Sequence, residues 1–415
     1  MCNRKTNDDF EFNYGAEGLE KMIESAKEND LGSVWERMIV NAIKATPLPN
    51  TPLLIDSLKE EFGIPESIAN DTIQDTMERT QLLFKLNGEN QLVRDCAVHG
   101  LTDRARISGA ALQKVEKTDF CNIVNTCCKV FSDKTLILTR HGKITAIHSG
   151  DEKDYSVLPI SELLGELVAH MDAKYPGYKF AGGSESHNLT IAAFGMPNQA
   201  KAMLKEYFDA VEAHGGSPNS DFIPGVVFAS SDTGVSGANL HAVIGNGRYS
   251  GRSIRIGTAL KLEHRSGATV GDFKENLGML FAKFVEQTQV LSRLLDVELL
   301  YPEAAMSRIA KKLSLPSKQS SQAIADYIDA FGPGVANAHD LYFALYETVF
   351  LAKSEGITGS KLFQIEESAT RAMLLDWESY DYPETNSGSA TLTTVTATIT
   401  AAVVTAAPTK ATHVA

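Results

Sequence analysis

The 415-residue sequence contains no apolar run close to the roughly twenty residues that a membrane-spanning helix needs. Its beginning, Met1–Tyr14, is polar and acidic and lacks the apolar core of a secretory signal. These two absences predict a soluble, cytoplasmic protein without a membrane partner. A hydrophobic fraction of 43% with 22% charged residues is typical of a folded globular chain.

Residues that build common catalytic and metal sites are scarce or wrongly spaced. The five cysteines are Cys2, Cys96, Cys121, Cys127 and Cys128. Their odd number in a chain predicted to be intracellular argues against a disulfide framework, and they form no CxxC pair, so we expect buried thiols more than a zinc site. The ten histidines form no HExxH motif, and no phosphate-binding P-loop is present. We therefore predict no catalytic residues, cofactor or metal, and lean away from an enzyme.

Positive charge is also in short supply, because 39 Lys and Arg face 52 Asp and Glu, which gives a net charge of -13. Residues 1–95 contain 18 acidic and 10 basic residues and supply -8 of this charge. One stretch reverses the trend. Asn246–Gly267, NGRYSGRSIRIGTALKLEHRSG, carries five cations and the single acid Glu263.

The apolar patterns predict an α+β fold. A helical N-terminal region precedes an α+β core with antiparallel strands packed on long helices, followed by a helical C-terminal part and a low-complexity tail. The predicted domains are an acidic helical region with a possible winged-helix-like hairpin (1–95), the core (96–300), the helical part (301–383) and a Thr/Ala-rich tail (384–415).

Within these regions, the spacing predicts two helices between residues 16 and 45, and hairpins at Asn87-Gly88 and His141-Gly142. Residues 158–175 read as an amphipathic helix, and residues 269–300 as one long helix. A helix followed by the Asn87-Gly88 hairpin is the order of a winged helix. Its candidate DNA-reading helix carries Asp71, Asp75 and Glu78 against Arg79, so we favour a protein-contact or packing role over DNA binding there.

The cation-rich stretch predicts a two-faced strand. Period-two alternation over Ile254–Leu262 places apolar residues on one face and Arg255 and Lys261 on the other, with small residues between the cations. We interpret this face as a groove for single-stranded nucleic acid, with Tyr249 available for base stacking. The predicted binding residues are Arg248, Tyr249, Arg252, Arg255, Lys261 and Arg265. The alternative is a solvated face whose arginines pair with acids of the same fold.

Three other segments are weaker signals. Asp232-Thr233-Gly234 resembles the loop of aspartic proteases, but a strand-ending Asx turn is the more ordinary interpretation. Gly182–His187, GGSESH, gathers serines and a histidine without the spacing of a nucleophile elbow. In the tail, Val395, Ala397, Ile399 and Ala401 alternate with threonine, so the segment is either disordered or able to extend a neighbour's sheet edge.

Four segments between residues 96 and 382 resemble a family of phage- and plasmid-borne proteins known as domain of unknown function 932. The segments are HGLTDRARISGAALQK, LILTRHGKITAIHSGDEKDYSVLPISELL, LEHRSGATVGDFKENLGMLF and NAHDLYFALYETVF. The resemblance implies a mobile-element origin and a bacterial host cytoplasm, and no known reaction. A sheet with a long helix and a cationic strand is also similar to the core of phage single-strand annealing proteins, by fold-level analogy.

These observations predict a phage- or plasmid-encoded, non-enzymatic homo-oligomer that binds single-stranded nucleic acid, with annealing in recombination as one role. The alternative is a structural or assembly protein of a phage particle, for which the basic stretch is a subunit contact. A more distant hypothesis is a hydrolase centred on Asp232 or His187.

Overall fold

The computed structural model describes residues 5–48, 66–107, 109, 111–151, 154–246 and 252–383. The chain divides into two compact units. The first comprises Met1–Gln199, Pro224–Val243 and Ala259–Lys283, and the second comprises Ala200–Ile223, Ile244–Thr258 and Phe284–Ala415. The predicted mixture of helices with sheets is confirmed. Each unit combines segments that are distant in sequence.

One sheet of the first unit comes from the N-terminal third of the chain. Its six strands have the order β2-β6-β7-β5-β4-β3, and β5 and β7 are its parallel pair. The bounds are β2 Ser33–Ile39, β3 Lys44–Pro47, β4 Leu82–Leu86, β5 Glu89–Val93, β6 Lys134–Arg140 and β7 Lys143–Ser149. Leu82, Phe84 and Leu86 alternate onto the face that packs with residues of α4 (Asp95–Arg104) and α5 (Lys117–Cys128).

The two predicted hairpins of this sheet are confirmed. Asn87 and Gly88 join β4 to β5 with φ of 50° and 100°, and His141 and Gly142 join β6 to β7 with φ of 51° and 74°. Both central residues of each turn are left-handed, as the twist of a two-residue hairpin requires, and Asn and Gly adopt this conformation at little cost.

The prediction of a helical N-terminal region is wrong in part. Helix α1 covers Leu19–Leu31, but the following segment SVWERMI forms strand β2 instead of a second helix. Strand β2 pairs antiparallel with β6, from Ser33 opposite Arg140 to Ile39 opposite Lys134. The aromatic and β-branched residues of this segment are common in strands. Its apolar spacing is compatible with a helix as well as a strand, and pairing with β6, about one hundred residues later, selects the strand.

The second sheet has the strand order β1-β8-β9-β10-β11-β12, and its first four strands pair antiparallel. The bounds are β1 Glu11–Tyr14, β8 Lys179–Ser186, β9 Thr190–Gly195, β10 Phe222–Ser230, β11 Asn239–Asn246 and β12 Ser253–Arg255. Strand β12 and the end of β11 belong to the second unit.

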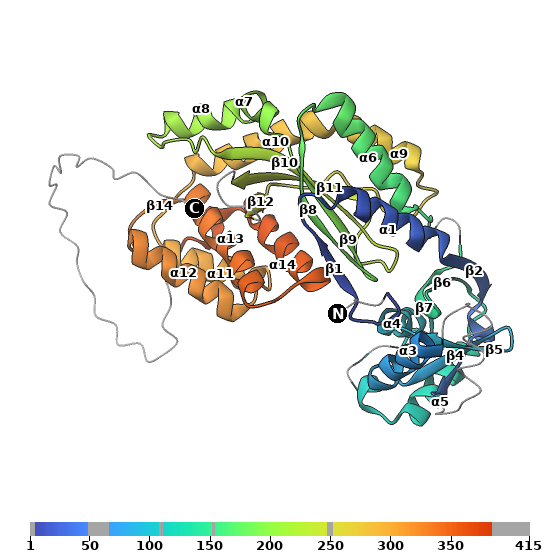
Figure 1. Ribbon diagram of the computed structural model, residues 1–415. Coiled ribbons are helices and arrows are strands. Elements are labelled where there is room, and N and C mark those ends of the chain that lie inside the picture. Colours follow the sequence, from blue (N-terminus) through green and yellow to red (C-terminus); the bar gives the residue numbers. More distant parts are fainter. Residues whose placement is uncertain are drawn as a thin grey trace, which may run out of the picture. The chain divides into compact units, whose positions relative to one another are not determined.

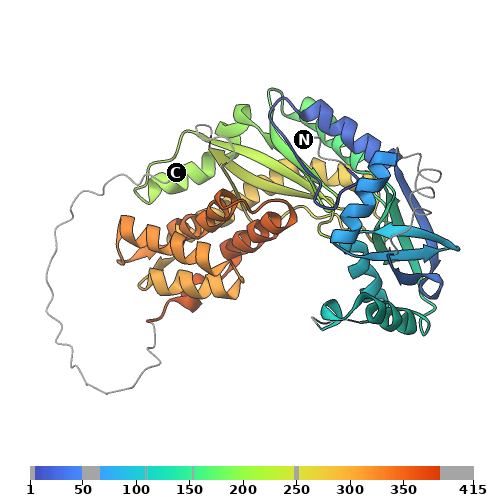
Figure 2. The same cartoon turned by 60° about the horizontal axis from the view of Figure 1, so that its bottom comes forward.

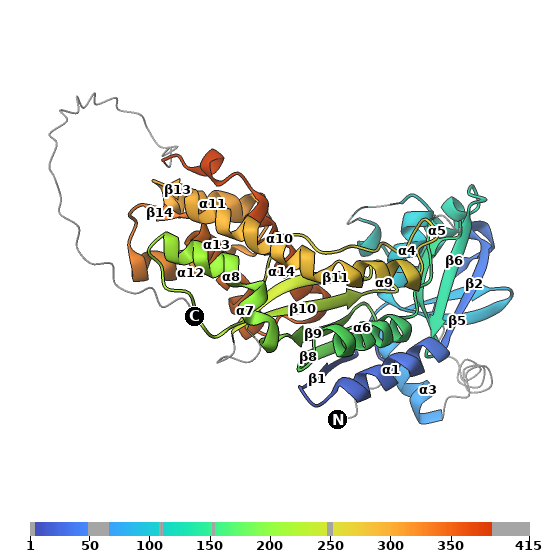
Figure 3. The same cartoon turned by 90° about the horizontal axis from the view of Figure 1, so that it is seen from above.

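Beside this sheet in the first unit, α6 (Ile160–Lys174) packs against both α1 and α9 (Val270–Gly278), as Figures 1 and 3 show. The predicted helix at 158–175 is therefore confirmed as α6. The predicted long helix is divided at Met279 into α9 and α10 (Leu280–Arg293).

The second unit is mainly helical, as predicted for residues 301–383. Four helices form a bundle in which α13 contacts the other three (orange to red in Figure 2). They are α11 Pro302–Lys312, α12 Ser317–Phe331, α13 Ala338–Ser354 and α14 Gly359–Arg371. Helix α13 buries residues on every side, including Tyr342 and Tyr346, which identifies it as the core of the bundle. The remaining elements of this part are α7 Ala200–Met203, α8 Lys205–Ala213, β13 Glu298–Leu299 and β14 Ala336–Asn337.

Candidate functional site

The predicted cationic strand is much shorter than the sequence pattern indicates. Strand β12 ends at Arg255, and Gly257 adopts a left-handed φ of 61°. A Cβ on Gly257 would lie 1.5 Å from Oε1 of Gln287, which accepts a hydrogen bond from the backbone N of Thr258 at 2.9 Å. The chain therefore leaves the extended conformation at Gly257, and Arg255 and Lys261 do not share a strand face. The two residues also belong to different units.

Arg255 was expected to point outward, and the structure shows that this expectation is wrong. Its side chain is 3% exposed, lies 4.4 Å above the ring of Phe363 and pairs with Glu366. Its backbone N donates to the hydroxyl of Tyr346 at 3.1 Å, and its carbonyl accepts from the hydroxyl of Tyr342 at 2.6 Å. Arg255 therefore ties β12 to helices α13 and α14 and is a structural residue of the second unit.

The other predicted binding residues lie either near Arg255 in the chain or after Gly257. Arg252 is exposed, yet it pairs with Glu347 at 3.6 Å and lies 5.0 Å above the ring of Phe350. Arg248 and Tyr249 fall outside the described residues.

In the first unit, Lys261 and Arg265 are exposed and line a shallow depression. Glu263 and Asp272 line the same depression, and Glu263 forms an ion pair with Arg265. Equal numbers of cations and anions leave little net field for a polyanion. Arg252, Arg255 and Arg265 thus pair with acids of their own fold, which agrees with the alternative interpretation of the cation-rich stretch.

A different group of polar residues is concentrated in the interior of the first unit. Arg140 at the end of β6 and Asp232 just after β10 are both buried, and Arg140 Nη2 donates to Asp232 Oδ2 at 2.5 Å. Arg140 Nε also donates to Ser33 Oγ at 2.7 Å, at the start of β2. This ion pair and the rings described next are called the Arg140–Asp232 centre.

Stacked rings surround the backbone of Asp232. His148 Nε2 donates to the carbonyl oxygen of Asp232 at 2.6 Å, and the hydroxyl of Tyr155 approaches the same oxygen at 3.4 Å. The rings of His148 and Tyr155 stack with centroids 3.8 Å apart, and His264 stacks on Tyr155 at 5.4 Å. Burial lowers the pKa of His148 to about 4, so its ring is neutral at neutral pH and donates through Nε2.

Two of the segments that carry the family resemblance supply four of the five residues of this centre. Arg140, His148 and Tyr155 come from LILTRHGKITAIHSGDEKDYSVLPISELL, and His264 comes from LEHRSGATVGDFKENLGMLF. Asp232 belongs to the segment read as a protease-like loop. We did not predict this site from the sequence, although arginine and histidine within otherwise apolar strands indicate buried polar groups that need partners.

Asp232 does not have the environment of an aspartic-protease carboxylate, because the guanidinium of Arg140 binds it. The turn after β10 is present as expected, with one difference. Ser231 Oγ, and not the Asp232 carboxylate, accepts from the backbone N of Thr233 and of Val235, each at 3.1 Å.

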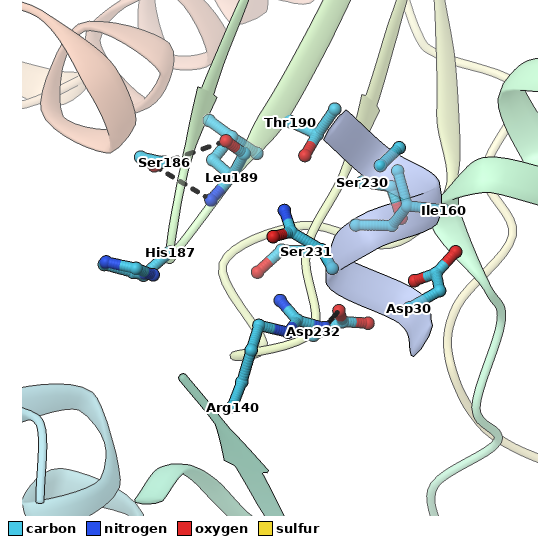
Figure 4. Close-up of a pocket in the computed structure, with 12 residues that line it drawn as sticks. Asp30, Arg140, Ile160, Ser186, His187, Leu189, Thr190, Ser230, Ser231 and Asp232 are labelled. Carbon is cyan, nitrogen blue, oxygen red and sulfur yellow. Dashed lines mark hydrogen bonds and ion pairs between the residues drawn. The ribbon is translucent and has the colours of Figure 1, made fainter. Parts of the chain in front are cut away.

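Next to the centre lies a cavity of about 10 Å³ with a polar wall (Figure 4). It is lined by Ala26, Asn29, Asp30, Arg140, Ile160, Ser186, His187, Leu189, Thr190, Ser230, Ser231 and Asp232. A volume of this size accommodates about one water molecule. Ser230 Oγ lies 3.4 Å from His264 Nε2, but Ser230 is fully buried, and the cavity beside it has no room for a substrate. The hydrolase hypothesis finds no support in this geometry.

A second buried network holds the N-terminal segment. Asp8 Oδ1 accepts from Arg94 Nη1 at 2.6 Å and from Lys143 Nζ at 3.0 Å. Lys143 Nζ also donates to Asp75 Oδ2 at 2.5 Å. Burial raises the pKa of Asp75, but Lys143 and Arg79 outweigh burial, and the net pKa lies below its ordinary value. Asp75 of α3 (Glu66–Glu78) therefore turns inward to pair with lysine, in agreement with a packing role for this helix.

The described residues contain no group of three or more His, Cys, Asp or Glu side chains placed to hold a metal ion. None of the helices in the described part of the chain has the length and apolar character needed to cross a membrane. No protein-family model, curated protein or solved structure matches this chain. The family resemblance and the mobile-element origin remain predictions.

Proposed function

We propose that the chain is a non-enzymatic assembly protein whose subunits associate through the outer edge of strand β2. The proposal rests on the exposure of apolar side chains along this edge. Val34 within the strand is 60% exposed, and Leu31, the last residue of helix α1 and two residues before the strand, is 88% exposed. Ile39 at its end is exposed as well, on the opposite face of the strand from Val34. In the described residues, β2 is the terminal strand of its sheet. Such an edge is a template for pairing with another chain.

The opposite edge of the same sheet offers an internal comparison. On β3, the side chain of Asn125 binds the backbone of Ala45 twice, accepting from its N and donating to its carbonyl oxygen, both at 2.8 Å. Pro47 ends that strand and cannot donate to a further ladder. These are the devices by which proteins block an edge. The β3 edge of the sheet is thus covered by α5. We therefore assign the contact between subunits to the β2 edge.

The two charged residues of β2 are engaged within the subunit. Glu36 Oε1 accepts from Asn87 Nδ2 at 2.5 Å, and Arg37 Nε donates to the carbonyl oxygen of Gly150 at 3.3 Å. Charges directed outward would oppose pairing of a second strand with β2. Both charged side chains have a partner in the same unit, and Arg37 is the more exposed of the two.

The magnitudes favour weak association. Full burial of three aliphatic side chains contributes at most about 5–9 kcal/mol. Loss of translational and rotational freedom costs about 4–15 kcal/mol, so backbone pairing must supply the remainder. We expect a dissociation constant in the micromolar range.

The test is light scattering coupled to size exclusion between about 1 and 100 μM protein, which brackets this range. The unmodified chain should increase in mass with concentration, and Val34→Lys, which places a charge on the edge, should remain monomeric. Val335→Lys is the matched control, because Val335 is equally exposed but lies in the second unit, and this variant should associate normally. A monomeric unmodified chain at every concentration would refute the proposal, as would equal association of both variants.

Binding of single-stranded nucleic acid is the second candidate, favoured by Lys261 and Arg265 in their exposed depression. Even if both cations contact phosphates, which requires Arg265 to leave its ion pair with Glu263, the log-log salt slope is only about -1.4 for a single strand. Fluorescence anisotropy with a labelled oligonucleotide at about 50 mM salt tests it, because weak phosphate contacts survive there. The double variant Lys261→Glu, Arg265→Glu should abolish the signal. Arg255→Glu is unsuitable, since it would place a carboxylate next to Glu366 in the core.

A further inference from the structure

Two cationic side chains surround one carboxylate in the interior of the first unit. Arg94 and Lys143 are 2% and 0% exposed, and both donate to Oδ1 of Asp8, at 2.6 Å and 3.0 Å. Asp75 compensates one of the two positive charges, because Lys143 Nζ also donates to its Oδ2 at 2.5 Å. Asp8 supplies the second negative charge that this buried group requires. Arg94, Lys143 and the space that the Asp8 carboxylate fills are called the carboxylate site.

Arg94 is placed to bind two oxygens of one anion. Its Nη1 donates to Asp8 Oδ1, and its Nη2 donates to the carbonyl oxygen of Lys5 at 3.1 Å. Its Nε donates to Thr145 Oγ1 at 3.3 Å, which fixes the guanidinium from the other side. The two Nη groups thus bind acceptors from two different residues of the N-terminal segment. A free carboxylate offers both oxygens on one carbon, in the parallel geometry that a guanidinium binds most strongly.

Asp8 fills the carboxylate site incompletely. Its Oδ2 is buried and has no hydrogen-bond partner among the residues that the structure describes. A buried acceptor without a partner costs free energy, because it has lost its bonds to water. Asp8 is therefore a weaker occupant than an anion that uses both of its oxygens.

The chain next to Asp8 is held by bonds that water can replace. The carbonyl oxygen of Asn7 accepts from His187 Nε2 at 2.7 Å, and Lys5 Nζ donates to the carbonyl oxygen of Ser25 at 3.3 Å. A hydrogen bond of this kind contributes little net free energy, since folding exchanges it for a bond to water. The residues that must move to free the site are thus weakly held apart from Asp8 itself.

We propose that Arg94 and Lys143 form a binding site for a small carboxylate ligand, with Asp8 as the built-in occupant that the ligand displaces. The buried charge determines the class of ligand. Without Asp8, the two cations Arg94 and Lys143 and the one anion Asp75 leave a net charge of +1, which a singly charged carboxylate neutralises. Doubly charged phosphate would leave excess negative charge in the interior. Binding releases residues 5–9 from the site, so the ligand controls the N-terminal segment.

The first experiment replaces the missing carboxylate with formate. Asp8→Ala removes the carboxylate and keeps the Cβ, so formate has the size of the group removed. Urea unfolding of this variant is compared in about 0.1 M sodium formate and in sodium chloride of the same ionic strength. The unfolding equilibrium constant should be about tenfold lower in formate, which corresponds to a dissociation constant of about 10 mM.

Asp8→Asn is the matched control, because its amide fills the space and formate should change its unfolding constant less than about twofold. Sodium phosphate of equal ionic strength should stabilise Asp8→Ala less than formate does. Equal stability of Asp8→Ala in formate and chloride would overturn the proposal, and stronger stabilisation by phosphate would overturn the class of ligand. If Asp8→Ala is unfolded in chloride, formate should restore its circular dichroism, and failure to do so counts against the site.

The second experiment tests displacement in the unmodified chain. Hydrogen exchange over residues 5–10, measured by mass spectrometry, should be about threefold or more faster in about 0.5 M formate than in chloride, because the ligand competes with Asp8. Residues 82–86 of β4 are the internal control and should exchange equally in both salts. Exchange over residues 5–10 that does not differ between the salts would overturn displacement. Neither experiment depends on association through β2.

Discussion

Arg140 and Asp232 lie 92 residues apart in the sequence and form a buried ion pair, in which Nη2 of the arginine donates to Oδ2 of the aspartate at 2.5 Å. The pair joins the end of β6 in one sheet to the turn after β10 in the other. Both side chains are buried, so water cannot solvate the charge of one partner when the other is removed. Removing one partner of such a pair lowers the free energy of unfolding strongly, because the other charge is left buried without a counter-charge.

Asp232→Asn should therefore destabilise the protein strongly. The substitution keeps the shape of the side chain but leaves the guanidinium of Arg140 buried without a counter-charge, which costs about 3–5 kcal/mol. Urea unfolding followed by circular dichroism measures the loss. Glu263→Gln is the control, because it removes the acid from the exposed pair with Arg265, where about 1 kcal/mol or less is at stake. Equal losses in the two variants would contradict a structural role for the Arg140–Asp232 centre.

Stability should fall on mild acidification. Burial lowers the pKa of His141 to about 3 and that of His148 to about 4, whereas an unfolded histidine titrates near 6.5. Below pH of about 6.5 the unfolded chain binds more protons at these two histidines than the folded chain, so their contribution to stability is fully present above this pH and is lost progressively toward about pH 3. Asp30 acts in the opposite direction, because burial raises its pKa.

Urea midpoints measured at several pH values between neutrality and pH 5 check this dependence. His148→Gln retains a donor for the carbonyl of Asp232 and removes one titrating group, so its stability should vary less with pH. A variant with the same pH slope as the unmodified chain would show that His148 does not contribute to the acid sensitivity.

Gly257→Ala should be more destabilising than Gly215→Ala. Both glycines have a left-handed φ, of 61° and 77°, and this backbone conformation costs an L-residue about 1–2 kcal/mol. Only at Gly257 would the new Cβ also strike Gln287, whereas nothing lies within 4 Å at Gly215. We expect an additional loss of about 1–3 kcal/mol for Gly257→Ala from overpacking, measured as the difference in unfolding free energy. Similar losses at the two positions would mean that Gln287 moves aside freely.

Asp8→Asn should loosen the N-terminal segment. Asp8 neutralises Arg94 and Lys143, which are both buried, and its removal leaves Asp75 as the remaining acid on Lys143. We expect a loss of about 3 kcal/mol and faster proteolytic cleavage before β1. Asp9→Asn, which removes an exposed partner of Arg79, is the matched control and should change little. Proteolysis at the same rate in both variants would contradict the predicted role of Asp8.

The candidate site was less accessible to sequence reasoning than the fold. Alternation over Ile254–Leu262 correctly placed Ile254 and Ile256 in the core but also predicted an outward Arg255, because a strand pattern carries no information about what packs on its other face. The aromatic side chains that cover Arg255 come from α13 and α14, about ninety to one hundred residues later. The Arg140–Asp232 centre was missed for the same reason, since its five residues come from two strands and three separate connecting segments.

The sequence determined those features whose energy is local. The Asn87-Gly88 and His141-Gly142 turns follow from the backbone preferences of the turn residues, and α6 follows from its own apolar spacing. The tertiary structure decided that SVWERMI is a strand, that Arg255 is buried and that Arg140 meets Asp232. Each of these depends on a partner distant in the chain, and a buried charge or a strand edge is stable only once that partner is in place.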